Sequence, residues 1–410
     1  MIKLNKKFKN SRGIRFNLTT ALLTIFLFFV AIKGDKSGGS ALQETVDLPN
    51  IFVMLKDFSF VFMAVGFVSQ ILYLRRRNFG LISNISISWL AMLTIYYFRM
   101  CLDEPSMIPK LIISFFIYFW ITYYIGVLKN NFNDGKKETL DIIYFAMLWF
   151  SFIYSFINAG MLLNGDGVLL LSGRFVGFTD HPNFVGMAAS IALAVCVYAF
   201  SNQDKAERWL GGIGAASALF VLIGSGSRTS LITGSVGVFF IAIRWMRTGR
   251  NIWGMNFLFA IVLLVLLIPS IGVEIGSSIG LDAAFIRLHE SENTRKDVWD
   301  ALILQIANEP LIGVGASVTA SESSFLRIAA ASGLVVGGWF LVNLITVLVV
   351  AIKNLKASCY RGDIVFILLS QVIIGSFAEG YLTEFLGLMP VLFVILIAAL
   401  GISKGLVLSR

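Results

Sequence analysis

The sequence predicts an all-α polytopic membrane protein with about twelve transmembrane helices and a large outer loop between spans 9 and 10. Three observations predict this fold. The chain is 57% apolar and only 14% charged, with a mean hydropathy of +0.82, so most of its surface suits lipid rather than water. A window of about 19 residues finds twelve apolar segments. Lys and Arg then collect in alternate connections between these segments.

The charge pattern gives the topology. Of the 33 Lys and Arg residues, 22 fall in segments that lie inside if both termini are inside, as the positive-inside rule requires. The formal net charge of +9 is divided into short clusters between apolar runs. This pattern is typical of topology signals, and it excludes nucleic-acid binding as a function.

The first apolar segment follows a basic stretch, as in a signal peptide, but more apolar segments come after it, so we expect an uncleaved first span. The later spans follow in order, and the seventh and eighth are separated only by the short polar stretch 224–230. Read as one kinked helix, these two would reverse the orientation of everything downstream. The twelve segments are centred near residues 25, 63, 88, 118, 150, 192, 216, 236, 262, 339, 373 and 394.

These segments divide the chain into spans 1–9 (residues 1–272), an outer loop (273–325) and spans 10–12 (326–410). The loop is long enough to suggest a function. Within it, 294–297 has the form of a capping box, and Trp299, Leu302 and Ile306 share one helical face. We expect an amphipathic helix at the outer leaflet, ended by Pro310, that holds Arg295 near the headgroups.

Small residues and cysteines add two expectations. The spacing Gly333-x-x-x-Gly337 predicts close packing of a span inside the molecule rather than dimerisation. The three cysteines, Cys101, Cys196 and Cys359, fall in different compartments of this topology, so no disulfide is expected.

Two polar motifs lie at the outer ends of spans five to eight. The first, residues 173–183, contains Arg174, His181 and Asn183 among glycines; the guanidinium of Arg174 suits phosphate oxygens, although a turn with a snorkelling arginine has the same pattern. The second, Gly224-Ser-Gly-Ser-Arg228-Thr-Ser230, is typical of an anion-binding nest and equally of a capped interhelical turn.

Two further motifs belong to the outer loop. Arg295 leads into the helix that ends at Pro310-Leu-Ile-Gly313-Val-Gly315. The polar stretch 321–324 then begins span ten, where Glu322 either complements the helix dipole or takes part in chemistry. Arg327 is expected one turn deeper in that span, which requires a polar surrounding.

Titratable groups elsewhere are few. Glu379 and Glu384 lie near the outer ends of spans eleven and twelve, and the two histidines, His181 and His289, lack further ligands at metal spacing, so no metal or other cofactor is predicted. Several arginines and one carboxylate at one membrane face suit an anionic, lipid-linked substrate.

From about Arg174 to Gly338, the chain resembles the superfamily of bacterial O-antigen ligases and O-antigen or exopolysaccharide polymerases. The motifs that carry the resemblance are Arg295-x-x-x-Trp299 leading to Pro310-Leu-Ile-Gly313-Val-Gly315, the entry Ser324-Phe325-Leu326, and, earlier in the chain, 173–183 and Ser227-Arg228-Thr229. They occur in the order that the family has.

The resemblance implies an inner-membrane glycosyltransferase without metal or nucleotide sugar. It would transfer glycan from undecaprenyl diphosphate at the periplasmic face, with both termini cytoplasmic. Arg174 and Arg295 stand where the family grips the diphosphate, and Arg228 would be a third contact. His181, Asn183, Ser323 and Arg327 are the other residues expected to bind substrate.

One departure bears on the reaction. Ligases of this superfamily carry a histidine just before the span that follows the large loop, where this chain has Ser321-Glu322-Ser323. The departure favours a polymerase, in which Glu322 accepts or orients the acceptor hydroxyl.

The resulting prediction is a polysaccharide polymerase acting on lipid-linked repeat units for an exopolysaccharide, capsule or O-antigen. Its expected partners are the lipid-linked oligosaccharide, the bilayer, a chain-length regulator and a flippase. Two alternatives stay open: a ligase that moves finished polymer to lipid A-core or protein, and a secondary transporter or flippase. A transporter would have its polar groups near the bilayer midplane in two related halves.

Overall fold

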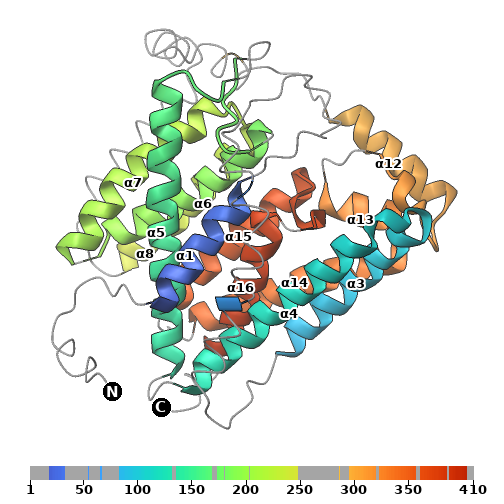
Figure 1. Cartoon of the computed structure of the whole chain (residues 1–410), viewed down its shortest axis with the longest axis horizontal. Helices are drawn as coiled ribbons and strands as arrows, with labels where there is room; N and C mark the ends of the chain where they lie inside the picture. The colour runs from blue at the N-terminus through green and yellow to red at the C-terminus, as the bar shows by residue number, and fades with distance from the viewer. Residues whose placement is uncertain are drawn as a thin grey trace.

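The computed structural model describes residues 18–32, 54, 65–66, 83–131, 135–168, 173–179, 181–202, 204–247, 286, 295–319, 323–356, 361–385 and 387–403. Over these residues the chain is helical, and its β-structure is limited to one bridge between Val168 and Phe175. The predicted all-α class is therefore confirmed. Figure 1 shows helices of different tilt packed around a central group that includes α15 and α16.

Among the described residues, seven helices are long and apolar enough to cross a membrane. These are α3 (Asn84–Asp103), α4 (Ile108–Asn131), α5 (Gly135–Leu163), α6 (Pro182–Phe200), α7 (Lys205–Gly224), α8 (Arg228–Arg247) and α14 (Leu334–Lys356). Three shorter apolar helices accompany them: α1 (Leu18–Ala31), α15 (Gly362–Ala378) and α16 (Leu388–Ser403). Each coincides with a predicted apolar segment. The predicted spans near residues 63 and 262 lie outside the described residues, so the count of twelve stays a prediction.

The helices α7 and α8 are separate and run antiparallel. Both pack along α6, where a Cβ added to Gly186 would lie 2.7 Å from Ser225 Oγ and 2.8 Å from Ser230 Oγ. Farther along α6, Cys196 meets Gly214 of α7, and Ala194 meets Gly237 of α8. These contacts show that α7 runs antiparallel to α6 and that α8 runs parallel to α6. This arrangement excludes the reading of the two as one kinked helix.

The centre of the molecule is formed by helices that are apolar on every side. Most residues of α15 are buried, and in α16 residues such as Val391, Phe393 and Ile395 are fully buried. The Trp89 ring of α3 lies against Phe393 of α16, with ring centroids 4.6 Å apart, and against Phe340 of α14 at 5.6 Å. An all-round apolar sequence in these helices reflects burial in protein.

The predicted tenth span is interrupted. A short helix, α13 (Ser324–Ser332), ends at Gly333, whose φ is +87°, and the candidate membrane span α14 begins at Leu334. The Leu334 amide donates to the Pro310 carbonyl (2.8 Å), which fixes the break. Arg327 therefore lies on α13 and not on the helix α14 of the candidate span, and its depth in the membrane stays a prediction.

The segment predicted to be the outer loop contains the predicted helix, α12 (Lys296–Asn308), which ends shortly before Pro310. Its position at the outer leaflet stays a prediction. The predicted face is confirmed, because Leu302 is buried while Trp299 is half-buried. The residue at the N-cap is Arg295, and no side chain caps the helix there. The predicted capping box has Thr294, which lies outside the described residues, as its N-cap. The structure has Arg295 at that position, so the helix begins one residue later than predicted.

The glycines after α13 pack inside the molecule. A Cβ on Gly337 would lie 2.8 Å from the Cβ of Ala329 on α13, and one on Gly333 would collide with the carbonyl oxygen of Leu311. The internal packing predicted for this Gly-x-x-x-Gly spacing is confirmed.

Candidate functional site

Polar residues from distant parts of the chain meet at one end of the helix bundle. At this end, called the site end below, α6 and α8 begin and α7 and α15 finish. Three bonds hold these helix ends together: Arg174 Nε donates to the Ser225 carbonyl (2.9 Å), Asn183 Nδ2 to Glu379 Oε1 (2.9 Å), and Ser324 Oγ to the Glu379 carbonyl (2.9 Å). These bonds join three of the motifs that the sequence singled out, and the ion pair of Arg295 with Glu379 adds the fourth.

Arg174 is positioned by a loop fastened to neighbouring helices. The Phe175 amide donates to the Gly224 carbonyl (3.0 Å) at the end of α7, and the Phe178 amide donates to Asn158 Oδ1 (3.3 Å) on α5. Phe175 and Phe178 are buried, so their apolar side chains anchor the loop while Arg174 stays half-buried. Gly177 has a φ of +53° and no room for a Cβ beside Asn158.

Asn183 connects Arg174 to an acidic group. It lies in the first turn of α6, where its Oδ1 accepts from Nη2 of Arg174 (3.0 Å) and its Nδ2 donates to Glu379. His181 is the N-cap of this helix, and its Nδ1 accepts from the Asn183 amide (3.1 Å). In this structure, therefore, Asn183 belongs to the polar network and His181 fixes the start of its helix.

Glu379 is at the centre of the network. It is the C-cap residue of α15, and its Oε1 forms an ion pair with Nη2 of Arg295 besides accepting from Asn183. The Glu379 side chain is only 7% exposed and that of Arg295 is 24% exposed. Arg174 and Arg295, called the arginine pair below, are thereby linked through Asn183 and one carboxylate. The sequence placed both arginines at one face but did not predict this link, and their contact with a diphosphate stays a prediction.

The serine motif forms a packed turn. Ser227 Oγ and Ser230 Oγ are 2.8 Å apart, and Ser225 Oγ donates to the Leu222 carbonyl (2.7 Å). All three serines are buried, so the structure favours the capped interhelical turn over an open nest for an anion. Arg228 is the first residue of α8 and half-buried, and its contact with a diphosphate stays a prediction.

Tyr381 adds a fixed donor. It lies in the short helix η3 (Tyr381–Thr383), and its hydroxyl donates to the Asn183 carbonyl (3.3 Å). Burial, and secondly the charge of Glu379, raise the pKa of Tyr381 well above its usual value. The phenol consequently stays protonated and remains a hydrogen-bond donor at physiological pH.

The remaining predicted residues lie on or before α13. Ser323 is the N-cap of this helix, with its hydroxyl accepting from the Leu326 amide (3.5 Å). Arg327 donates through Nη1 to Thr383 Oγ1 (3.3 Å) and so contacts η3 beside the network. Glu322 and His289 lie outside the described residues, so the predicted role of Glu322 as a base stays a prediction.

The motif from Pro310 to Gly315 has a structural role here. Arg99 of α3 donates to the Gly313 carbonyl (2.9 Å) and pairs with Asp103 (2.8 Å), whose Oδ2 accepts from the Ala316 amide (3.1 Å). The Val314 amide donates to the Ala330 carbonyl of α13 (2.8 Å). These bonds hold the segment that follows α12 against α3 and α13. They thereby help to position α12, which carries Arg295 at its N-terminus.

Glu379 lies at the centre of the site, but the sequence predictions did not include it among the site residues. The sequence placed it at the outer end of a span but gave no partner for it. A carboxylate at the C-terminal end of a helix is opposed by the helix dipole and, when buried, requires a cation or hydrogen-bond donors. That unfavourable position is the signal that could have identified it.

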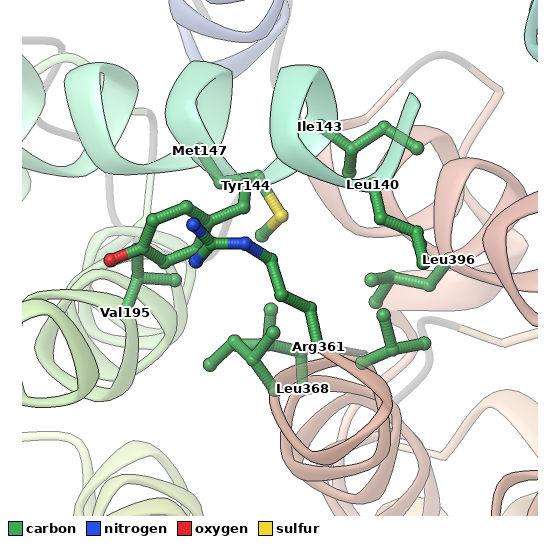
Figure 2. Close-up of a pocket in the computed structure, with 10 residues that line it drawn as sticks. Leu140, Ile143, Tyr144, Met147, Val195, Arg361, Leu368 and Leu396 are labelled. Carbon is green, nitrogen blue, oxygen red and sulfur yellow. The ribbon is translucent and has the colours of Figure 1, made fainter. Parts of the chain in front are cut away.

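The opposite end of the bundle carries structural ion pairs. Arg361 pairs with Asp141 (2.7 Å) and stacks over the Tyr144 ring at 3.7 Å, and Arg244 pairs with Asp363. Figure 2 shows the cavity beside Arg361, which is lined mainly by apolar side chains of α5, α6, α15 and α16. These groups neutralise one another and pack, so they do not suggest a second catalytic site.

Within the described part of the chain, no three His, Cys, Asp or Glu side chains gather in a way that could hold a metal ion. The chemistry available at the site end is that of guanidinium, amide, phenol and carboxylate groups. Such a set binds anions, stabilises negative charge on a leaving group and exchanges protons.

Comparison with known families agrees with this chemistry. Residues 213–339 match the model of the O-antigen ligase family. The matched region includes the serine turn, α12 with Arg295, and α13, whereas Arg174, Asn183 and Glu379 lie outside it. No curated protein and no solved structure matches the chain. The match supports the superfamily that the motifs resemble, and a glycosyltransferase activity of the ligase or polymerase type.

Proposed function

We propose that this membrane protein, with its O-antigen ligase region, is a polysaccharide polymerase. It transfers a growing glycan from undecaprenyl diphosphate to a repeat unit carried by a second lipid. The observation that supports this proposal most directly is the arginine pair, which two separate motifs bring to one carboxylate at the site end.

Guanidinium groups suit the difficult part of this reaction. The acceptor hydroxyl oxygen attacks the anomeric carbon of the donor, and the bond between that carbon and the phosphate oxygen breaks. The diphosphate leaves with the electron pair, so negative charge grows on its oxygens in the transition state. Planar donors fixed beside those oxygens stabilise that charge. One direct displacement inverts the anomeric configuration.

The acceptor hydroxyl must also lose its proton. In this proposal Glu322 takes it, because this carboxylate stands where ligases of the superfamily carry a histidine. A carboxylate serves as the base when its surroundings raise its pKa or when the proton leaves late. Arg228, His181, Asn183, Ser323 and Arg327 are proposed to contact the substrates or to hold the groups that do.

The proposal assigns the protein to the bacterial inner membrane, with cytoplasmic termini and a periplasmic active site. A flippase would supply the lipid-linked repeats and a chain-length regulator would limit the product.

The second candidate is a ligase that moves finished polymer to lipid A-core or protein, and the family match at residues 213–339 favours it equally.

The glycan profile of a deletion strain tests the proposal. If the protein is a polymerase, the strain loses the polymer but still makes single repeats, and the gene supplied in trans restores the polymer. Full-length polymer stranded on the lipid carrier would instead identify a ligase. A glycan normal in both amount and length would contradict both activities.

A further inference from the structure

Glu379 is the point at which both members of the arginine pair are held. It binds Arg295 directly in an ion pair, and it binds Arg174 through Asn183, whose amide accepts from Arg174 (3.0 Å) and donates to Glu379 (2.9 Å). Because Asn183 uses its oxygen for one partner and its nitrogen for the other, its orientation is defined. Glu379 therefore sets the position of two guanidinium groups, that of Arg295 directly and that of Arg174 through Asn183.

The main chain around Glu379 is fixed as well. Its carbonyl accepts from both the amide (3.2 Å) and the hydroxyl (2.9 Å) of Ser324, and its own amide donates to the Gly375 carbonyl (2.9 Å). The carboxylate consequently projects from a rigid helix end. A rigid support of this kind keeps a positioning group within a small distance of its working geometry.

The Glu379 carboxylate is contacted by a charged and a neutral donor among the described residues. These are the guanidinium of Arg295 and the side-chain amide of Asn183, which also binds Arg174. A half-exposed arginine could be satisfied by water, but the carboxylate is almost buried and lies at the negative end of a helix dipole. Such an arrangement is costly, and the ion pair with Arg295 and the hydrogen bond from Asn183 offset that cost.

We propose that Glu379 is the positioning residue for the arginine pair and that the donor replaces it on Arg295. In the empty site, the carboxylate holds Arg295 and, through Asn183, Arg174 in an assembled arrangement. When the diphosphate binds, its oxygens replace the Glu379 carboxylate on the guanidinium of Arg295, whose side chain is 24% exposed. This inference rests on the proposed function, since it assumes a diphosphate donor.

Carboxylate and phosphate oxygens compete for the same planar fork of donors. Through this competition the Glu379 carboxylate lowers the affinity for the donor. The same carboxylate holds the arginine side chains in place before the donor arrives, so fewer side chains have to be ordered on binding. Removing the charge of Glu379 should therefore lower turnover without lowering the affinity for the donor. A side chain that only stabilises the fold would lower both together.

The test compares two measurements on purified full-length protein in lipid nanodiscs. One is the affinity for undecaprenyl diphosphate, with undecaprenol as the uncharged probe. The other is polymer formation from lipid-linked repeats at saturating donor. Glu379→Gln should bind undecaprenyl diphosphate as tightly as the wild type or more tightly, while turnover falls about tenfold or more. Glu379→Asp, which retains the charge, should recover part of the turnover.

Glu309→Gln is the matched control, because Glu309 is an exposed carboxylate that follows α12. It should change neither measurement. A second variant, Asn183→Ala, removes the link to Arg174 but leaves the main-chain bonds from Tyr381 and Ser230 to residue 183 in place. It should lower turnover about tenfold or more without loss of thermal stability.

The outcomes separate this inference from the proposed function. If the wild type binds undecaprenyl diphosphate no better than undecaprenol, the diphosphate donor itself is wrong. If the wild type binds it but Glu379→Gln has normal turnover, or loses affinity and turnover in parallel, only the positioning role is overturned. If Glu379→Gln does not fold, normal turnover in Asn183→Ala overturns the inference.

Discussion

At the scale of single residues, the two arginines of the site are held in different ways. Arg174 donates to a main-chain carbonyl and to an amide, whereas Arg295 pairs with a carboxylate. Arg174 therefore uses Nε and Nη2 for two partners at once. A lysine carries its three donors on one nitrogen and cannot reproduce the planar fork that Nε and Nη2 provide.

We expect Arg174→Lys and Arg295→Lys each to lower polymer formation about tenfold or more, which corresponds to about 1.4 kcal/mol of barrier. The charge is retained, so the loss reports the geometry of the fork. The measurement is polymer formation by membranes that contain matched amounts of each variant. Wild-type polymer levels in both variants would remove the arginine pair from the mechanism.

A separate prediction concerns Glu322. If this carboxylate accepts the proton of the acceptor hydroxyl, Glu322→Gln should keep donor affinity and lose turnover, because an amide is nearly isosteric but a poor base. If it only complements the helix dipole, the change should cost under about 1 kcal/mol of stability and little activity. Partial recovery in Glu322→His would support both the base role and the relation to ligases. Near-normal turnover of Glu322→Gln would favour the dipole role.

Sequence motifs predicted that Arg174, Asn183 and Arg295 belong to one face of the membrane, and the structure brings them together. They did not predict that Glu379 joins them. Motifs describe neighbours along the chain, whereas the bond from Asn183 to Glu379 connects α6 to the end of α15. Such a contact depends on how helices pack, and hydropathy alone does not determine that packing.

At the scale of elements, the break between α13 and α14 is the feature that hydropathy missed. Ile328 to Ala331 are apolar and buried, so a sliding window joins them to the span that follows. The break requires one residue with a positive φ next to a main-chain carbonyl. Only glycine adopts that conformation at little cost.

We therefore expect Gly333→Ala to destabilise the protein by about 1–3 kcal/mol, since a Cβ would collide with the Leu311 carbonyl and the positive φ adds strain. Gly338→Ala is the control, because a Cβ at Gly338 has no atom within 4 Å. Thermal unfolding of the purified variants measures the difference. Equal midpoints for both variants would show that the break tolerates a side chain.

At the scale of the whole molecule, the charges divide between the two ends of the bundle. The arginine pair with Glu379 lies at the site end, and the ion pairs of Arg361 and Arg244 lie at the other.

Hydropathy and charge predicted the positions of the helices well, because both follow from the cost of placing polar groups in lipid. They could not predict which helices are central, since lipid and protein interiors both favour apolar residues.

The topology is tested by reporter fusions along the chain. Fusions at Arg76 and Arg247 should read as inside, and those at Gly173 and Glu292 as outside, because Lys and Arg favour the cytoplasmic connections. An inside reading at Glu292 would place Arg295 on the wrong side for a periplasmic donor. A reporter with the opposite compartment preference should give the complementary pattern at all four positions.

The position of Glu379 between the last two described helices, α15 and α16, has a consequence for biosynthesis. During synthesis the chain inserts into the membrane from its N-terminus, so Arg174 and Arg295 are both in place before their shared carboxylate is made. Until then the two arginines lack the carboxylate that links them through Asn183. The site is completed only when α15 has been inserted, and a chain that stops after α14 lacks the residue that joins its two halves.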